Sequence, residues 1–298
     1  MSKTSILIPT RGEKFENIVN TVDSICKNAT GEYEIIIGFN GYPTYNFFRP
    51  NVDIKIIKFP EDVGIKTNIN ALVATARGKY IYKSDAHCAF GKGFDEILQA
   101  DMEDDWIVMP RFKIIKDDWT IQMRDGQEEF YDYFYLCCPF TDPKGFRFKA
   151  GGHWKERTKE RLADYEPHID ETPQIHGSGC FMTKDRFFEM GGFPITDPYG
   201  HAMEPINLAL KNWLKGGKVM VNKRTWYAHM HQQSNKRGYP EDKRKTEFTY
   251  NQTATHWMAN KEPNLIHDIR WFVNKFMPMP GWSENWIDLY TRWLEGRK

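Results

Sequence analysis

An acidic residue and a histidine stand at the end of an apolar, β-prone run in the stretch YIYKSDAHCAF, residues 80–90. Asp85 and His87 are two residues apart, so on an extended chain their side chains point the same way. A carboxylate beside an imidazole is a ligand pair for a divalent cation. The pair suits Mn²⁺ better than Ca²⁺, with Mg²⁺ and Zn²⁺ as alternatives. We therefore expect this strand end to face a bound cation.

Three further residues of the same chemical kinds lie about 120 residues or more along the chain. His229 and His231 follow the apolar stretch KVMVNKRTWY, again two residues apart. This spacing favours a ligand role for one or both, and a plain surface position is the alternative for His231. Glu204 precedes Pro205 at the start of an expected helix, where proline is tolerated and the helix dipole favours a negative charge. It is either a capping acid or a carboxylate that serves catalysis or acceptor binding.

The first 110 residues alternate between strand and helix patterns. Short apolar runs predict strands at 5–8, 33–39, 53–59, 79–83 and 106–110, and apolar residues at helical spacing predict helices near 15–26 and 65–76. Such alternation indicates an α/β fold with right-handed crossovers and a mostly parallel sheet. Ligands of these sheets bind beyond the carboxyl ends of the strands. Pro9-Thr10-Arg11, Asn40-Gly41 and Asp85-Ala86-His87 all follow predicted strands, so we expect them to line one site.

The remaining chain is less regular. Residues 111–172 read as strands and loops, and the stretch HGSGCFMTKDRFFEMGGF (176–193) reads as a glycine-rich turn and a strand leading into a helix. We divide the chain into a catalytic domain over 1–234, with a nucleotide-binding half at 1–110 and an acceptor-facing half at 111–234, and a helical, aromatic C-terminal extension over 235–298. One amphipathic helix of the extension is predicted from the spacing of Ile266, Ile269, Phe272, Val273 and Phe276.

Composition constrains the setting and the partners. The formal charge is +1, which does not indicate a nucleic-acid or membrane partner for the chain as a whole. Residues 211–245 are an exception, with ten Lys/Arg against two acids, and predict either a solvated basic face or a site for a polyanion. Five scattered cysteines without a CxxC pair indicate a reducing, cytoplasmic setting. No apolar window approaches the roughly 20 residues of a membrane helix, and we expect no signal peptide.

The order of these motifs resembles the nucleotide-sugar glycosyltransferases of the GT-A fold, and within them the family-two transferases and the polypeptide N-acetylgalactosaminyltransferases. The matching stretches run from residue 4 to residue 231: SILIPTRG, YEIIIGFNG, VGIKTNINALVATARGKYIYKSDAHC, GSGCFMTKDRFFEMGGF, GHAMEPINLALKNWLKGGKV and WYAHMH.

The resemblance implies a role for individual residues. Asp85 and His87 correspond to the DxD-type cation motif in its DxH form, and His229 corresponds to the distal histidine ligand. The nucleotide-sugar would lie against Pro9, Thr10, Arg11, Asn40, Gly64, Lys66, Asn70, Asp85, Gly177, Ser178 and Gly179. Glu204 aligns with the acidic residue near the acceptor. Two departures matter. Asn40 stands where many relatives carry an acid that contacts the base, and Pro205 stands where family-two enzymes often carry a second acid, the usual base.

The function that follows from the resemblance is metal-dependent transfer of a sugar from a nucleoside-diphosphate donor, with UDP expected, to an acceptor hydroxyl. A cation held by Asp85, His87 and His229 would act as a Lewis acid on the diphosphate, with Lys66 or Arg11 adding fixed positive charge. Glu204 is the candidate base if configuration inverts, and a binding residue if it is retained. Three acceptors stay open: a hydroxymethylated base in DNA bound by the basic segment, a polysaccharide precursor, and a protein. A metal-dependent hydrolase or nuclease and a non-catalytic binding module are the alternatives of another class.

Overall fold

The computed structural model describes residues 3–149, 151–162, 167–193, 203–231 and 243–297. Thirteen strands are assigned within this part: β1 Thr4–Thr10, β2 Tyr33–Asn40, β3 Ile54–Phe59, β4 Tyr80–Ser84, β5 Cys88–Phe90, β6 Trp106–Ile115, β7 Met123–Arg124, β8 Gln127–Glu128, β9 Phe134–Tyr135, β10 Gly152–His153, β11 Ile169–Glu171, β12 Gly179–Thr183 and β13 Lys218–Met230. Nine helices accompany them: α1 Phe15–Asn28, α2 Ile65–Thr75, α3 Phe94–Ala100, α4 Lys155–Leu162, α5 Lys184–Glu189, α6 Glu204–Leu214, α7 Lys243–Met258, α8 Ile269–Phe276 and α9 Trp286–Glu295.

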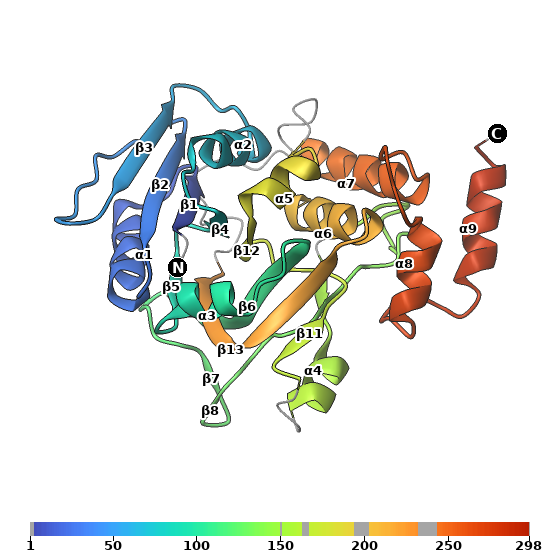
Figure 1. The fold of residues 1–298 in the computed structure, drawn as a ribbon. Coiled ribbons are helices and arrows are strands. Elements are labelled where there is room, and N and C mark those ends of the chain that lie inside the picture. The colour runs from blue at the N-terminus through green and yellow to red at the C-terminus, as the bar shows by residue number, and fades with distance from the viewer. Residues whose placement is uncertain (1–2, 150, 163–166, 194–202, 232–242, 298) are drawn as a thin grey trace.

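One nine-stranded sheet forms the centre of the molecule (Figure 1). Its order is β11-β13-β6-β12-β4-β1-β2-β3, and β5 pairs with β13 beside this path. Six strands (β1, β2, β3, β4, β6 and β13) run in one direction, because β12 is antiparallel to both of its neighbours β4 and β6. The predicted α/β class with a mostly parallel sheet is therefore confirmed.

The helices cover the sheet in layers. In Figure 1, helices α2, α5 and α6 lie over one face of the sheet. Helices α1 and α3 lie near each other, apart from that group. Helix α2 is tied to the segment after α5 by Asn70, whose side-chain amide donates to the Phe193 carbonyl oxygen at 2.9 Å and whose side-chain oxygen accepts from the Phe193 backbone N–H at 3.0 Å. Helix α3 is tied to the turn after α1 by Asp95, which accepts from the backbone N–H groups of Thr30 at 3.0 Å and Gly31 at 2.8 Å.

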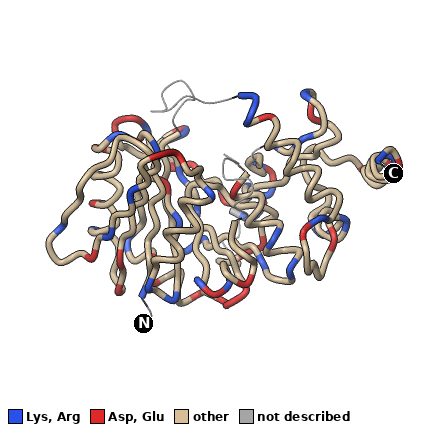
Figure 2. Tube along the Cα trace, turned by 90° about the horizontal axis from the view of Figure 1, so that it is seen from above, with Lys and Arg blue, Asp and Glu red and all other residues tan. Residues whose placement is uncertain are grey.

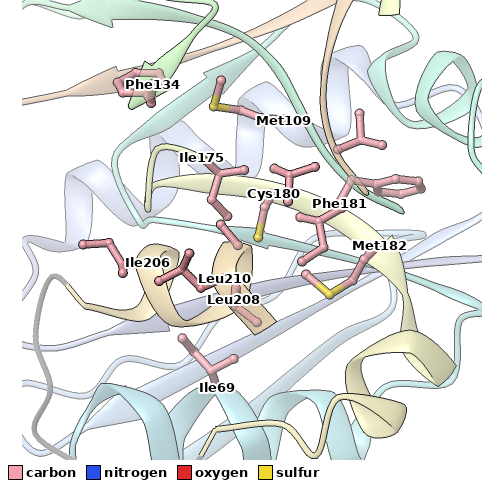
Figure 3. Packing of buried hydrophobic residues seen from close by; sticks show 14 of the residues in the cluster. Ile69, Met109, Phe134, Ile175, Cys180, Phe181, Met182, Ile206, Leu208 and Leu210 are labelled. Carbon is pink, nitrogen blue, oxygen red and sulfur yellow. The ribbon is translucent and has the colours of Figure 1, made fainter. Parts of the chain in front are cut away.

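Part of the core lies between the sheet and the layer of α2 and α6. Apolar side chains from α6, α2 and β12 point toward one another in Figure 3, with Ile206, Leu208 and Leu210 of α6 facing Ile69 of α2 and the β12 residues. Leu210 and Phe181 are 0 % exposed. Complete burial of such side chains stabilises the fold by roughly 1.5–3 kcal/mol each, and it fixes the start of α6 relative to the strand ends.

Two sequence expectations are wrong in detail. Residues 155–162 form helix α4 in the segment expected to hold only strands and loops. Its sequence, KERTKERL, has no broad apolar face, so the apolar pattern did not mark it. Ile266 lies outside α8 and is 69 % exposed, because that helix begins only after the Asp268 side chain caps it by accepting the Trp271 N–H at 2.9 Å.

The sheet extends through both predicted halves of residues 1–234, and the C-terminal helices pack on the second half. The indole Nε1–H of Trp257 in α7 donates to the side-chain oxygen of Asn207 in α6 at 2.8 Å. Trp213 of α6 lies 5.2 Å from Phe276 of α8, between ring centroids. Helix α9 lies farther from the sheet, at the opposite end of the molecule from β3 (Figure 1). The division at residue 235 stays a prediction.

The charged residues do not separate by sign along the described chain (Figure 2). None of the helices in the described ranges has the length and apolar character needed to cross a membrane.

Candidate active site

Asp85, His87 and His229 converge at the carboxyl ends of the strands. Asp85 directly follows β4, and its backbone N–H donates to the Ser178 carbonyl at 2.9 Å. His87 stands in the bend between β4 and β5, and His229 belongs to β13. Antiparallel pairing of β5 with β13 sets Cys88 opposite His229, which brings His229 beside His87 although the two are 142 residues apart.

The three side chains have the spacing of ligands around one ion. The Nε2 atoms of His87 and His229 are 2.9 Å apart, and His229 Nε2 lies 3.2 Å from Asp85 Oδ2. Neighbouring ligand atoms of one octahedral cation, with bonds of roughly 2.1 Å, lie roughly 3 Å apart. All three ligand atoms are within 4.8 Å of one another. The residues present therefore fit a divalent cation of the kind that the resemblance implies.

Charge and burial keep these groups ready to bind a cation. Burial raises the pKa of Asp85, but the Lys83 ammonium and the hydrogen bond with His229 outweigh it and hold the pKa well below its ordinary value. Burial lowers the pKa of His229 to about 3, against the opposing effect of Asp85. At neutral pH the site thus presents an ionised carboxylate and a neutral imidazole, the protonation states that metal ligands require.

Two residues around this set were not predicted from the sequence. Glu13 Oε2 lies 2.8 Å from His87 Nδ1, so the carboxylate holds the ring nitrogen that faces away from His229. Lys83 pairs with Asp85 Oδ1 and also donates to the Gly177 carbonyl oxygen. Lys83 could have been found, because it stands in β4 only two residues before Asp85. Glu13 lies 74 residues from His87, and no local pattern connects the two.

Three of the residues predicted to face the nucleotide, Arg11, Asn40 and Gly64, form a second group around Asp62. Arg11 Nη2 lies 2.8 Å from Asp62 Oδ2, while the Asn40 amide donates to Asp62 Oδ1 at 2.7 Å. The Gly64 N–H donates to the same oxygen at 2.9 Å. Gly64 has φ of 80°, a conformation that glycine adopts without steric cost, and it is the N-cap residue directly before α2. Asp62, in the stretch EDVG, is thus a third unpredicted residue, and it supplies an acid beside Asn40.

Of the other residues predicted to contact the nucleotide-sugar, some stand at strand ends near the site and others hold elements of the fold together. Pro9 and Thr10 end β1, with Thr10 5 % exposed. Lys66 is 1 % exposed within α2, and Asn70 ties α2 to Phe193 rather than pointing away from the protein. Gly179 opens β12, where a side chain would meet Tyr82 and Tyr227 at 2.8 Å.

Glu204 is the first residue of α6 and lines a cavity together with Lys83 and Gly177. The rest of that lining is almost entirely apolar and includes Leu7, Ile69 and Leu208. Burial lowers the pKa of Lys83, but Asp85 and, more weakly, Glu204 outweigh it and raise the pKa. The buried Lys83 ammonium is therefore paired with Asp85, and it shares a cavity lining with Glu204.

Comparison with known proteins identifies the family. Residues 5–161, more than half of the chain, match the model of glycosyl transferase family 2. The chain belongs to glycosyl transferase family 2. The family predicted from the motifs is thereby confirmed.

Relatives and solved structures agree with this assignment. The chain is 26 % identical over 251 residues to a probable N-acetylgalactosaminyltransferase 6 of Caenorhabditis elegans, covering 80 % of this chain and 39 % of that protein. It is 24 % identical over 238 residues to the human polypeptide N-acetylgalactosaminyltransferase 13, covering 74 % of this chain and 40 % of that one. The chain thus spans about two fifths of the length of these relatives.

The structural neighbours show the fold. A crystal structure of GalNAc-T7 with UDP, GalNAc and Mn²⁺ superposes with a TM-score of 0.69 at 16 % identity, covering 87 % of this chain and 50 % of that one. Staphylococcus aureus TarS superposes with a TM-score of 0.50 at 12 % identity, covering 78 % of this chain and 37 % of that one. The predicted GT-A fold is confirmed.

Proposed function

We propose that this family 2 protein is a cation-dependent glycosyltransferase that moves a sugar from a UDP-sugar to an acceptor hydroxyl. The observation that carries the proposal is the convergence of Asp85, His87 and His229 at ligand spacing. The cation, with Mn²⁺ first and Mg²⁺ second, would supply Lewis acidity to the leaving diphosphate. The neighbour that was crystallised with UDP and Mn²⁺ supports this choice of donor and ion.

The chain's own residues have separate tasks in the proposed reaction. Asp85, His87 and His229 would hold the ion, and Glu13 orients His87 through Nδ1. Asp62, held by Arg11 and Asn40, marks the nucleoside side of the site. As the acceptor oxygen forms a bond to the anomeric carbon and the bond to the diphosphate breaks, Glu204 takes the hydroxyl proton. The apolar lining around Lys83 and Glu204 keeps water away from the reacting groups.

The proposal is tested by the melting temperature with UDP, in the presence and the absence of Mn²⁺. A ligand that binds only the folded state stabilises it by about 2.7 kcal/mol at 100 times its dissociation constant. We expect stabilisation by UDP with Mn²⁺ and little without it. GDP, CDP and TDP serve as matched controls for the base. The absence of stabilisation by any nucleotide with any divalent cation would contradict the proposal.

Glu13→Gln tests the support of the cation set. The substitution keeps the shape of the side chain but removes the negative charge that orients His87, and loss of such an outer partner weakens metal binding by roughly 10–100-fold. We expect the Mn²⁺ concentration needed for UDP stabilisation to rise by that factor. Glu16→Gln, at an exposed acid in the first turn of α1, is the control and should leave it unchanged. An equal response of the two variants would exclude an orienting role for Glu13.

Glu204→Gln tests the base. Removing a general base lowers kcat by roughly 10²–10⁴-fold, while UDP stabilisation with Mn²⁺ should persist. Glu189→Gln, on the exposed surface of α5, is the control. A rise in the acceptor KM with unchanged kcat would show that Glu204 binds the acceptor and is not the base.

For the acceptor we propose a protein hydroxyl, because the human relative is a polypeptide N-acetylgalactosaminyltransferase. DNA, the other acceptor considered, depends on the basic segment 211–245. Part of that segment is not free to bind DNA. Lys223 is 2 % exposed, and Lys211 is buried and lies 3.6 Å from Glu262. Arg224 is exposed but lies 2.7 Å from Asp101. Lys236 and Arg237 fall outside the described residues, and Lys243, Arg244 and Lys245 are exposed at the start of α7.

The two acceptors can be compared directly. Transfer of labelled sugar from UDP-GalNAc to a Ser/Thr-rich peptide supports the protein hydroxyl. Transfer to hydroxymethylated duplex DNA, with binding that weakens steeply as salt rises, supports DNA instead. Unmodified DNA and a peptide without hydroxyl groups are the controls, and the absence of DNA binding at low salt would exclude the DNA acceptor.

A further inference from the structure

Three imidazoles lie together beside the proposed donor-cation set. His176, His229 and His231 each offer one ring nitrogen, and these three atoms lie within 4.8 Å of one another. Their ring centroids are 5.1 Å apart for His229 and His231, and 5.4 Å apart for each of the other two pairs. His176 comes from the turn before β12 and His231 directly follows β13, so the tertiary fold assembles this group.

Phe112 of β6 packs against all three rings. It stacks on His176 with centroids 4.4 Å apart and planes inclined by 11°. It meets His231 edge-on at 5.7 Å and lies 6.2 Å from His229. Phe112 itself is held by the pairing of β6 with β13, where it stands opposite Tyr227. The positions of the three imidazoles are therefore set by the sheet.

A hydrogen-bonded chain orients His176. Its Nδ1 lies 2.6 Å from Ser178 Oγ, and this hydroxyl donates to the Tyr227 hydroxyl oxygen at 3.2 Å. Ser178 is 1 % exposed and Tyr227 is 0 % exposed. Histidines that bind metals ordinarily donate their second ring N–H to such an oxygen. Ser178 thus contacts Nδ1 through its hydroxyl and, at 3.3 Å, through its backbone N–H, so Nε2 is the ring nitrogen left to face an ion.

The donor set determines which ion would bind. Three imidazoles without a carboxylate favour zinc-class ions, Zn²⁺ and Co²⁺, over Mn²⁺ or Mg²⁺, which prefer oxygen ligands. Three histidines with an open fourth position are a known zinc arrangement. A neutral imidazole carries a lone pair on one of its two ring nitrogens, and that nitrogen is the atom that binds a metal ion.

We propose that His176, His229 and His231 form a second cation position, selective for zinc-class ions, which shares His229 with the donor-cation set. A neutral imidazole has one unprotonated nitrogen, so His229 cannot serve both ions at once. Zinc bound at this position withdraws a ligand from the Asp85 set and thereby inhibits the enzyme. Zinc binding stands independently, whereas the inhibition rests on the proposed function.

Binding is tested with Co²⁺ as a coloured substitute for Zn²⁺, titrated into the metal-free full chain. Two matched variants separate the positions: His231→Gln removes a ligand only from the second set, and His87→Gln only from the first. His231 is exposed, so its replacement should leave the fold intact. We expect the visible absorption of tetrahedral Co²⁺ to persist in His87→Gln and its affinity to fall at least about tenfold in His231→Gln.

The same Co²⁺ titration includes a control variant and the outcomes that would overturn the proposal. His256→Gln, at a histidine in α7 paired with Glu262, should behave as the wild type. A Co²⁺ affinity in His231→Gln equal to that of the wild type would overturn the second position. So would loss of the tetrahedral absorption in His87→Gln with retention in His231→Gln.

Inhibition is tested by adding Zn²⁺ to protein stabilised by UDP and Mn²⁺. We expect Zn²⁺ to cancel the stabilisation in the wild type, and His231→Gln to need at least about ten times more Zn²⁺ for the same effect. Equal sensitivity of the two proteins would overturn the competition. If the wild type shows no UDP stabilisation at all, the proposed function fails, and the Co²⁺ titration still decides the second position.

Discussion

Asp85→Asn is expected to weaken Mn²⁺-dependent UDP binding by at least about 100-fold, and transferase activity with it. Loss of an outer partner already costs 10–100-fold in metal affinity, and Asp85 would be a direct ligand. It is also the acid of the three-residue set. An amide oxygen carries no net charge, so the remaining imidazoles would favour a softer ion than Mn²⁺.

The measurement is the UDP-induced shift in melting temperature over a series of Mn²⁺ concentrations. Asp104→Asn, at an exposed acid paired with Lys79, is the matched control and should titrate as the wild type does. Asp85→Asn leaves the Lys83 ammonium without its carboxylate partner, so the melting temperature without ligand shows whether the fold is intact. His87→Gln leaves that pair in place and gives a second test. A wild-type response to Mn²⁺ in both variants would exclude this cation site.

The strand-and-helix framework could be predicted from the sequence because its signals are local. The β1, β2, β3 and α2 segments are each rich in apolar residues or carry a helical apolar face, and their observed bounds lie within two residues of the predicted ones. Helix α4 is the opposite case. It is short and highly charged, and its packing is supplied by distant residues such as Asp170, which lies 3.9 Å from Arg157.

The candidate site also has residues that local sequence signals could predict and residues that they could not. Asp85 and His87 were recognisable because two ligand types stand two residues apart after a strand. His176 stands in HGSG beside small residues, and its partners Phe112 and His229 are 64 and 53 residues away in the printed sequence. Periodicity and spacing describe residues that are close in the sequence. The ligands of one ion come from distant segments, and the register of strand pairing brings them together. The β5–β13 pairing that brings His229 beside His87 has no counterpart in the sequence pattern.

Glu34→Gln is expected to lower the free energy of unfolding more than the other proposed substitutions. Glu34 lies far from the carboxyl ends of the strands, where the candidate site is. Glu34 stands near the amino end of β2 with a side chain that is 0 % exposed. Its carboxylate accepts from Ser5 Oγ at 2.6 Å and from the Arg77 backbone N–H at 2.7 Å, and Lys55 Nζ lies 2.9 Å away. These contacts hold together β1, β2, β3 and the turn after α2.

The pH dependence follows from the pKa of that carboxyl. Burial raises the pKa, but the hydrogen bonds from Ser5, Arg77 and Lys55 outweigh it and lower the pKa from 4.5 to about 2. The stabilisation is therefore fully present above about pH 4.5 and is lost as the pH falls toward 2. The shift corresponds to at most about 3 kcal/mol, because Lys55 and Arg77 are partly exposed and solvent screens their charges.

The measurement is the urea midpoint of wild type and Glu34→Gln at pH 7 and at steps down to pH 2. We expect the variant to unfold at lower urea at pH 7 and the difference to shrink between pH 4.5 and 2, since the wild-type carboxyl then becomes as uncharged as the amide. Glu32→Gln, at an exposed acid two residues earlier that lies 4.0 Å from Lys3, is the control and should show little difference at any pH. A difference that stayed constant down to pH 2 would mean that Glu34 acts through the shape of its contacts and not through its charge.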